Sequence, residues 1–340
     1  MLNEKDILKE LIKYDTYKDK ENIKIMNYIE ETLRNVGFKT DYKSKCLIMS
    51  IKQSSNLGFL GHTDTVKSGV NWKLNPLELK DIDGKLYGLG SCDMKGSIAA
   101  ILKACIDTNW KNYKKGIKLY FTYDEEIGFE GIKEINRLNY KFPENMIIGE
   151  PTYNELMNGS KGLLELKITF QGKSAHSSNP SKGVNAIEQC VNFVMDIKEF
   201  YNMLKKDINK DFQIPYTTMN IGKIEGGQSI NIVPDKATVY IDFRIIKNNH
   251  TIQILEEITN LQEKYKYEYE IINNIKPFIT KAQKAITTNF ITEASFIECE
   301  NRYILGAGPL TLHEPNEYIT TDSLEKLVKQ YKLAIEKLCI

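Results

Sequence analysis

Residues 57–64 read Leu-Gly-Phe-Leu-Gly-His-Thr-Asp, an apolar run that leads directly into His62 and Asp64. Three further polar clusters sit just past apolar, strand-like runs, at 91–94 (SCDM), 123–126 (YDEE) and 149–151 (GEP). Open α/β sheets place such side chains at the carboxyl ends of their strands, where several strands converge on one crevice. Together with His313 far downstream, these imidazole and carboxylate groups predict a metal site and favour a metallohydrolase.

The region around these clusters alternates between strand and helix patterns. Asp19 can cap a helix whose apolar residues recur at helical spacing, and Gly37 would end it. Further strands are expected at 46–51, 57–60, 117–123 and 146–148, with a buried helix at 97–105. This alternation predicts an α/β domain in which a mostly parallel sheet carries helices on both faces.

After Glu150 the pattern changes. Strands are expected at 163–171, 217–224, 236–244 and 267–272, with helices at 184–200 and 251–265. The order strand, helix, strand, strand, helix, strand is that of an α+β ferredoxin-like sandwich. With 340 residues the chain is long enough for two domains, and His313 follows the sandwich. The sandwich is therefore expected as an insertion at 157–274, with 1–156 and 275–340 forming the catalytic, metal-binding domain.

Composition narrows the function class. Charged residues make up 27% of the chain and the net charge is +1, so a nucleic-acid partner and an anionic membrane surface are not expected. No apolar run approaches the roughly 20 residues that span a bilayer, and the first residues are too charged for a signal peptide. The six cysteines form no C-x-x-C pair, which indicates reduced thiols. A cytoplasmic protein that acts on a small molecule is expected.

Six motifs follow one another along the chain: GHTDTV (61–66), GLGSCDMKGS (88–97), YDEEIGFEG (123–131), GEPT (149–152), GKSAHSS (172–178) and HEPNEYI (313–319). Together they resemble the M20 family of metallopeptidases and amidohydrolases. Within it the best likeness is to acetylornithine deacetylases and succinyl-diaminopimelate desuccinylases. The resemblance covers the chain from about His62 to its end. It implies a zinc-peptidase-like catalytic domain and an inserted domain that forms a homodimer.

The resemblance also implies a centre of two zinc ions, with cobalt or manganese as substitutes. Asp93 would bridge the two ions. His62 and Glu150 would complete the ligands of one ion, and Glu126 and His313 those of the other. A shared carboxylate suits two metals that lie about 3.5–4 Å apart.

Two further acids have implied roles at this centre. Glu125 would be the general base, since neighbouring residues usually point in different directions and leave one glutamate free. Asp64 would accept the other ring N–H of His62, and the Asp93-Met94 peptide would be cis. Taken singly, each residue has an ordinary alternative: a solvated loop end, a turn or helix cap, or a partly buried histidine.

The inserted domain carries three further candidates. His176 would stabilise an oxyanion across the dimer interface, and Arg244 would hold the substrate carboxylate with Asn231 as a companion contact. The alternatives are a loop histidine, a solvated strand-end arginine and a turn asparagine.

The implied reaction is hydrolysis of the N-acyl amide bond of an N-acyl amino acid, a step of amino-acid biosynthesis, by metal-activated water with Glu125 as the base. Acetylornithine deacetylase-like activity is the first expectation. Desuccinylase activity on succinyl-diaminopimelate and a di- or tripeptidase acting on short peptides are the alternatives within the family. A catalytically silent binding protein is the alternative from another class, and the complete ligand set together with Glu125 argues against it.

Overall fold

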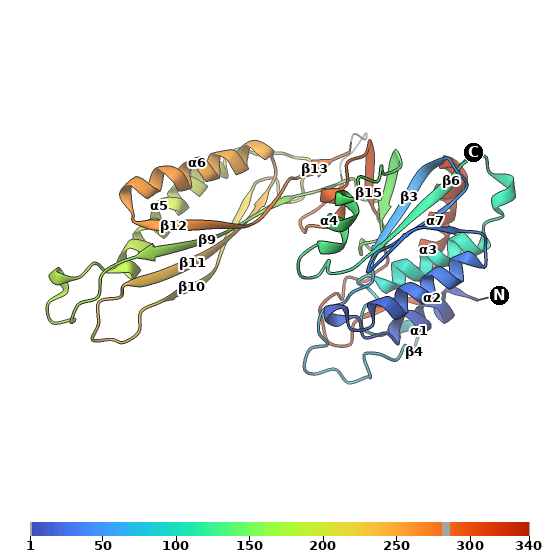
Figure 1. The fold of residues 1–340 in the computed structure, drawn as a ribbon, viewed down its shortest axis with the longest axis horizontal. Helices are drawn as coiled ribbons and strands as arrows, with labels where there is room; N and C mark the ends of the chain where they lie inside the picture. The colour runs from blue at the N-terminus through green and yellow to red at the C-terminus, as the bar shows by residue number, and fades with distance from the viewer. Residues whose placement is uncertain (1, 281–285, 340) are drawn as a thin grey trace. The chain divides into compact units, whose positions relative to one another are not determined.

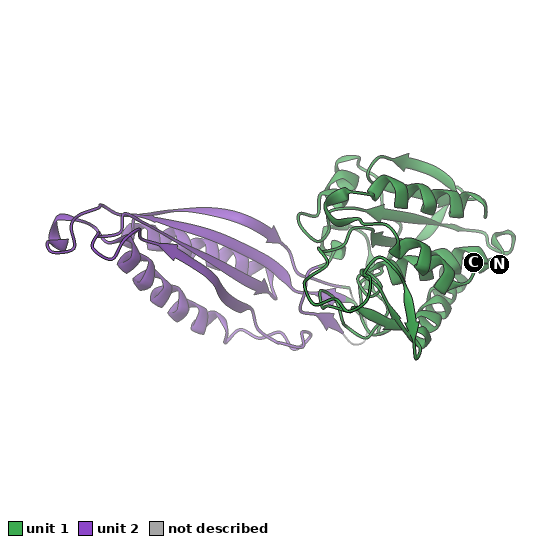
Figure 2. Ribbon diagram, turned by 90° about the horizontal axis from the view of Figure 1, so that it is seen from below, with its two compact units in different colours: residues 1–158, 280–282, 292–340 green, residues 159–279, 283–291 purple. Residues whose placement is uncertain are grey.

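The computed structural model describes residues 2–280 and 286–339, and the chain divides into two compact units (Figure 2). Unit 1 comprises Met1–Asn158, Thr280–Ala282 and Thr292–Ile340, and unit 2 comprises Gly159–Ile279 and Gln283–Ile291. Each unit has its own buried apolar cluster. Among the helices of the described residues, none has the length and apolar character that crossing a bilayer requires.

A six-stranded sheet forms the centre of unit 1, in the order β1-β2-β6-β3-β7-β15. The strands are β1 (Lys39–Lys43), β2 (Leu47–Ile51), β3 (Ser55–His62), β6 (Gly116–Thr122), β7 (Asn145–Ile148) and β15 (Asn301–Ile304). Strands β6, β3, β7 and β15 are parallel, while β2 runs antiparallel to β6 and to β1. The carboxyl ends of the parallel strands therefore share one edge.

Helices cover both faces of this sheet. The helices of unit 1 are α1 (Glu4–Ile12), α2 (Asn22–Arg34), α3 (Lys95–Asp107), α4 (Glu130–Arg137) and α7 (Thr321–Leu338) (Figure 1). Alternate residues of β3 point to opposite sides. Phe59 of β3 packs against Tyr331 of α7 in the main core. On the other face, Gly131 of α4 lies close to Thr122 of β6, since a Cβ on Gly131 would be 2.9 Å from Cβ of Thr122.

The start of the chain differs from the sequence expectation. Helix α1 was not expected, although Ile7, Leu8, Leu11 and Ile12 are buried on one side of it. Helix α2 begins at Asn22, so the prediction that Asp19 caps it is wrong. Gly37 has φ +98°, which confirms the left-handed turn predicted after this helix.

Two small sheets complete the connections. One contains β16 (Tyr318–Thr320), β5 (Lys85–Tyr87) and β4 (Lys80–Ile82). The other contains β13 (Phe278–Ile279), β8 (Gly159–Ser160) and β14 (Thr287–Thr288). The pairing of β14 with β8 groups residues 286–291 with unit 2, whereas the sequence pattern had placed them in the catalytic domain.

Unit 2 is the expected α+β sandwich. Its sheet has the order β10-β11-β9-β12, and all three pairings are antiparallel. The elements are β9 (Gly162–Gln171), α5 (Ala186–Leu204), β10 (Thr218–Gly226), β11 (Lys236–Ile245), α6 (Asn248–Lys264) and β12 (Tyr267–Ile275). Inward-facing residues such as Phe170 and Val239 alternate along the strands and pack against Phe193 of α5. The opposite face of the sheet carries polar side chains, among them Lys167 and Tyr240.

Candidate metal centre

Three adjacent parallel strands deliver candidate ligands to one edge of the sheet in unit 1. His62 is the last residue of β3, Glu125 and Glu126 follow β6, and Glu150 follows β7. Strand β3 lies between β6 and β7, so these residues leave the sheet side by side. This placement is the physical reason why acids and a histidine so far apart in sequence meet.

Loops supply the other two candidate ligands. Asp93 lies between β5 and α3, and its peptide bond to Met94 is cis, as expected. His313 lies between β15 and β16 in a left-handed conformation, with φ +60°. Such backbone conformations are uncommon for residues other than glycine and occur often at functional sites.

The ligand atoms form two groups that share Asp93. In the first group, His62 Nε2 lies 3.0 Å from Asp93 Oδ1 and 3.8 Å from Glu150 Oε1. In the second, His313 Nε2 lies 3.0 Å from Glu126 Oε2 and 3.5 Å from Asp93 Oδ2. Within each group the ligand atoms are all within 4.8 Å of one another. The two oxygens of Asp93 thus face two different histidines.

Burial gives this cluster strong electrostatic coupling. Burial and the Glu150 carboxylate raise the pKa of Glu125 well above its usual value. Burial and the charge of Asp93 likewise raise the pKa of Glu126 and of Glu150. Hydrogen bonds to Asp93 and Glu126 raise the pKa of His313 to about 10. Glu125, Glu126, Glu150 and His313 therefore hold their protons more tightly in the metal-free protein, and a divalent cation would compete with those protons.

Buried carboxylate oxygens that lack a hydrogen bond also indicate a site for cations. Glu126 Oε1 and Glu150 Oε1, each in one of the two ligand groups, are buried and have no hydrogen-bond partner among the described residues. A buried carboxylate oxygen without a partner is costly, and coordination of a cation would remove that cost. Two imidazoles with a set of carboxylates suit zinc and related divalent ions. The residues present therefore fit a two-metal centre.

Asp64 belongs to neither ligand group but contacts one residue of each, His62 and Glu126. His62 Nδ1 lies 3.1 Å from the main-chain oxygen of Asp64 and 3.5 Å from its Oδ1. The expected contact of the ring with the carboxylate is thus longer than the contact with the main chain. The other oxygen, Oδ2, accepts the N–H of Glu126 at 3.2 Å. Asp64 therefore links the segment after β3 to the segment after β6, next to both candidate ion positions.

Glu317 was missed by the sequence reasoning. Its carboxylate accepts the N–H groups of Gly90 (2.9 Å), Cys92 (2.7 Å) and Asp93 (3.0 Å). The signal was the position of Glu317 four residues after His313 in the motif HEPNEYI. Its main-chain contacts could not be read from the sequence.

The remaining candidates belong to unit 2. His176 is exposed, and its Nδ1 lies 2.8 Å from Ser178 Oγ. The N–H of Ser177 donates to the main-chain oxygen of Asn231 at 3.0 Å, so His176 and Asn231 lie on neighbouring loops. Arg244 donates through Nε and a terminal nitrogen to both oxygens of Asp242, at 3.0 and 2.9 Å.

Arg244 and Asn231 do not lie side by side within one chain. Asn231 precedes the first residue of β11, Lys236, and Arg244 is near its end. At about 3.3 Å per residue, the strand from Lys236 to Arg244 alone spans roughly 26 Å, and Asn231 lies before its first residue. A single chain therefore does not bring Asn231 to Arg244 as a companion contact.

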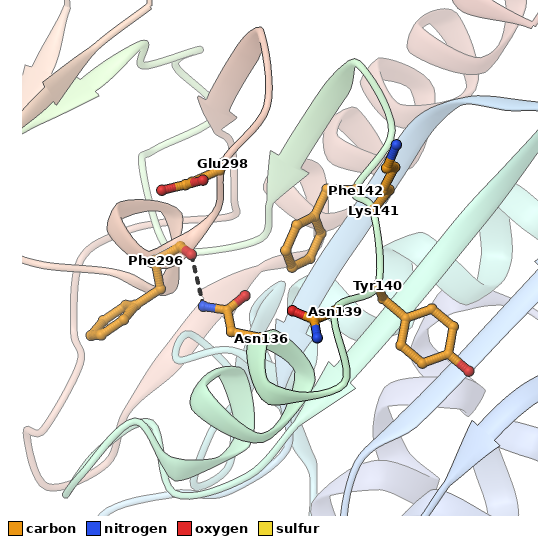
Figure 3. Close-up of a pocket in the computed structure, with 7 residues that line it drawn as sticks. All are labelled: Asn136, Asn139, Tyr140, Lys141, Phe142, Phe296 and Glu298. Carbon is orange, nitrogen blue, oxygen red and sulfur yellow. Dashed lines mark hydrogen bonds between the residues drawn. The ribbon is translucent and has the colours of Figure 1, made fainter.

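An open pocket of about 610 Å³ lies in unit 1 beside the end of α4 (Figure 3). There the side-chain amide of Asn136 donates to the main-chain oxygen of Phe296 at 2.9 Å, and Phe142 and Glu298 also line the pocket. None of the candidate ligands among the described residues lines it. The pocket is a feature separate from the ligand cluster.

Comparisons with known sequences agree with this geometry. Residues 158–270 match a family model described as the peptidase dimerisation domain of M20 proteins. The chain is 31% identical over 336 residues to the acetylornithine deacetylase of Klebsiella pneumoniae (strain 342), covering 89% of this chain and 88% of the relative. It is 29% identical to the acetylornithine deacetylase of Aliivibrio salmonicida (strain LFI1238), covering 96% and 94% of the two chains.

Solved structures share the fold. A tripeptidase from Staphylococcus aureus has a TM-score of 0.80 at 21% identity, with 100% of this chain and 99% of the other covered. A Bacillus subtilis protein described as a dinuclear metal binding peptidase has a TM-score of 0.72 at 14% identity, with 98% of each chain covered. These likenesses extend over both units of the chain.

Proposed function

Because the chain belongs to the M20 family of metallopeptidases and amidohydrolases, we propose that it is a two-metal hydrolase that removes the acyl group from an N-acyl amino acid. The observation that carries the proposal is the position of Asp93. Its Oδ1 lies 3.0 Å from His62 Nε2, and its Oδ2 lies 3.5 Å from His313 Nε2. A carboxylate with one oxygen in each ligand group is placed to bridge two ions.

The ligand groups define the proposed roles. His62, Asp93 and Glu150 would hold one ion, and Asp93, Glu126 and His313 the other. Two zinc ions, or cobalt or manganese as substitutes, would supply acidification of a water molecule and polarisation of the acyl carbonyl.

Glu125 is the proposed base. It is buried beside the cluster but belongs to neither ligand group, and among the described residues its carboxylate has no ion pair. A free carboxylate in this place can take a proton from the attacking water and return it to the leaving amine. Asp64, 3.5 Å from the ring of His62, would keep the Nε2 atom of that ring directed at the ligand group.

The second unit would complete the site as a homodimer. His176 of a second copy would donate a hydrogen bond to the developing oxyanion, and the match to a dimerisation domain supports such a pairing. Arg244 would bind the substrate carboxylate through its planar fork, with Asn231 as a contact from the other copy. Within one chain Asn231 lies before the start of β11 and Arg244 near its end, which favours this division between two copies.

The substrate class follows from the relatives. Two similar proteins are named acetylornithine deacetylase, which supports an N-acetyl amino acid as the substrate. A cytoplasmic role in amino-acid biosynthesis remains part of the proposal. The structural likeness to a tripeptidase is at 21% identity and supports the fold alone. Removal of an acetyl group from an amino acid is therefore the activity we propose.

A substrate panel tests the proposal. Acetylornithine, succinyl-diaminopimelate and a set of di- and tripeptides are incubated with the zinc- or cobalt-loaded protein, and kcat/KM is measured for each. The highest value for acetylornithine is expected. A higher value for a peptide or for the succinyl compound would assign the alternative activity, and no hydrolysis of any member would indicate a binding protein.

A further inference from the structure

Glu317 is a buried carboxylate without a cationic partner. Glu317 is 2% exposed, and its carboxylate forms no salt bridge with any of the described residues. The buried amine of Lys95 instead donates to the main-chain oxygen of Tyr14 at 2.8 Å. Burying an ionisable group costs free energy unless hydrogen bonds satisfy it, so the three N–H donors that face Glu317 have to be held in place around it.

Those donors all belong to the loop that carries Asp93. Oε1 accepts the N–H groups of Cys92 and Asp93, and Oε2 accepts that of Gly90. Gly90 has φ +79°, and a Cβ there would lie 2.8 Å from Cγ2 of Thr65. The loop therefore directs three of its N–H groups at the carboxylate of Glu317, and a side chain at Gly90 would collide with Thr65.

Glu317 also belongs to the segment of His313. It lies four residues after that histidine, and its main-chain oxygen accepts the N–H of Gly88 at 3.0 Å. One residue thus ties together the two loops that supply Asp93 and His313. Of the other candidate ligands, His62 ends β3 and Glu150 is two residues past β7, while the N–H of Glu126 donates to Asp64 Oδ2 at 3.2 Å.

We propose that Glu317 is a positioning residue that sets Asp93 against His313, and that its loss weakens the ion held by Asp93, Glu126 and His313 more than the ion held by His62, Asp93 and Glu150. The inference depends on the proposed two-metal centre. The two ions should differ because the two ligand groups contain different numbers of ligands on the loops that Glu317 holds. Without Glu317 the second group has two ligands on released loops, whereas the first group has only Asp93.

Glu317→Gln tests this with little change in volume. One carbonyl oxygen can still accept from Cys92 and Asp93, but the new NH₂ group faces the N–H of Gly90, which is also a donor. Glu30→Gln is the matched control. Glu30 is a buried carboxylate of α2 that pairs with Arg34 and Lys43, and it contacts none of the candidate ligands.

The readout is cobalt binding to the metal-free protein, titrated against a competing chelator. We expect two ions in the wild type and in E30Q. In E317Q one ion should bind ten- to hundredfold more weakly, the usual effect of losing a residue that orients metal ligands, and the other less than threefold. The ion that E317Q retains should have the affinity measured for the single ion of a His313→Ala variant.

Different outcomes would overturn the role of Glu317 and the proposed two-metal centre. Wild-type affinity for both ions in E317Q, or an equal loss of both, would overturn the positioning role of Glu317. Thermal unfolding of E317Q and E30Q shows whether weaker metal binding follows from a general loss of stability. Loss of both ions in E30Q as well would also overturn the positioning role of Glu317. A wild type that binds only one ion would instead overturn the two-metal proposal.

Discussion

Glu126 Oε2 lies 3.0 Å from Nε2 of His313, whereas the preceding residue, Glu125, belongs to neither ligand group. The turn after β6 therefore sends two consecutive carboxylates to different tasks. Glu126 faces a histidine that arrives from a segment 187 residues away. Glu125 is buried and belongs to neither group, which is the position that its proposed role as the base requires.

Glu125→Gln should lower kcat by about 10²- to 10⁴-fold, the usual contribution of a general base, while both ions stay bound. Glu126→Gln is the matched control, because it should lose one ion. Metal content and single-turnover rates of the two variants are compared. Loss of an ion in E125Q with retention of both in E126Q would mean that the roles are reversed.

His176 should act on the site of the other copy in a dimer. Neither His176→Ala nor Glu125→Gln should be active alone. Mixing them should restore activity, since a mixed dimer contains one site with both groups. The measurement is activity against mixing ratio after subunit exchange, with sedimentation to establish the dimer. Full activity of a wild-type monomer, or no recovery in verified mixed dimers, would contradict this role.

Arg244→Lys should weaken kcat/KM for substrates with a free carboxylate, because the planar fork that now holds Asp242 is lost although the charge is kept. The expected loss is about 1.5–3 kcal/mol, the usual value for a hydrogen bond to a charged group. Arg34→Lys is the control and should have no effect, because Arg34 is an exposed arginine of α2 that pairs with Glu30 in unit 1. Equal hydrolysis of an N-acetyl amino acid and its methyl ester by the wild type would remove this role from Arg244.

Glu293 should make the stability of the metal-free protein depend on pH. It is fully buried with Thr122 as its hydroxyl donor, and burial raises its pKa to about 8. Between the unfolded pKa, near 4.5, and about 8 the folded state holds the proton more tightly. This contribution to stability is therefore present at low pH and is lost as the pH rises through about 8.

Glu293→Gln removes this titration. Its free energy of unfolding relative to the wild type should rise by about 1.4 kcal/mol per pH unit across that window. Urea unfolding of both proteins at several pH values measures the difference. A difference that stays constant between pH 5 and 8 would show that Glu293 titrates normally.

The site residues at the strand ends could be predicted, because an apolar run and the polar residue that follows it can both be read directly from the sequence. His62 and Glu150 each follow a short apolar run, which marks a strand end. Helix α1 has only 9 residues, fewer than the window of about 11–18 over which a helical period is recognised, although Ile7, Leu8 and Leu11 have the spacing of a buried face. Strand β1 (Lys39–Lys43) is polar at the sheet edge, so it carried no apolar signal.

The role of Glu317 could not be predicted for a different reason. A glutamate in a polar loop has the composition of a solvated residue, and only the folded chain shows that it is buried under the loop of Asp93. In the same way, the ion pair of Arg244 with Asp242 and its distance from Asn231 depend on strand register. Contacts of this kind arise from tertiary structure and leave no periodic pattern in the sequence.

The most direct test of the two-metal centre is a crystal structure of the zinc-loaded protein with anomalous diffraction at the zinc edge. Two peaks about 3.5–4 Å apart are expected, with one oxygen of Asp93 on each ion, His62 and Glu150 on one, and Glu126 and His313 on the other. A single peak, or two peaks of which Asp93 touches only one, would contradict the bridging role on which the proposed function depends.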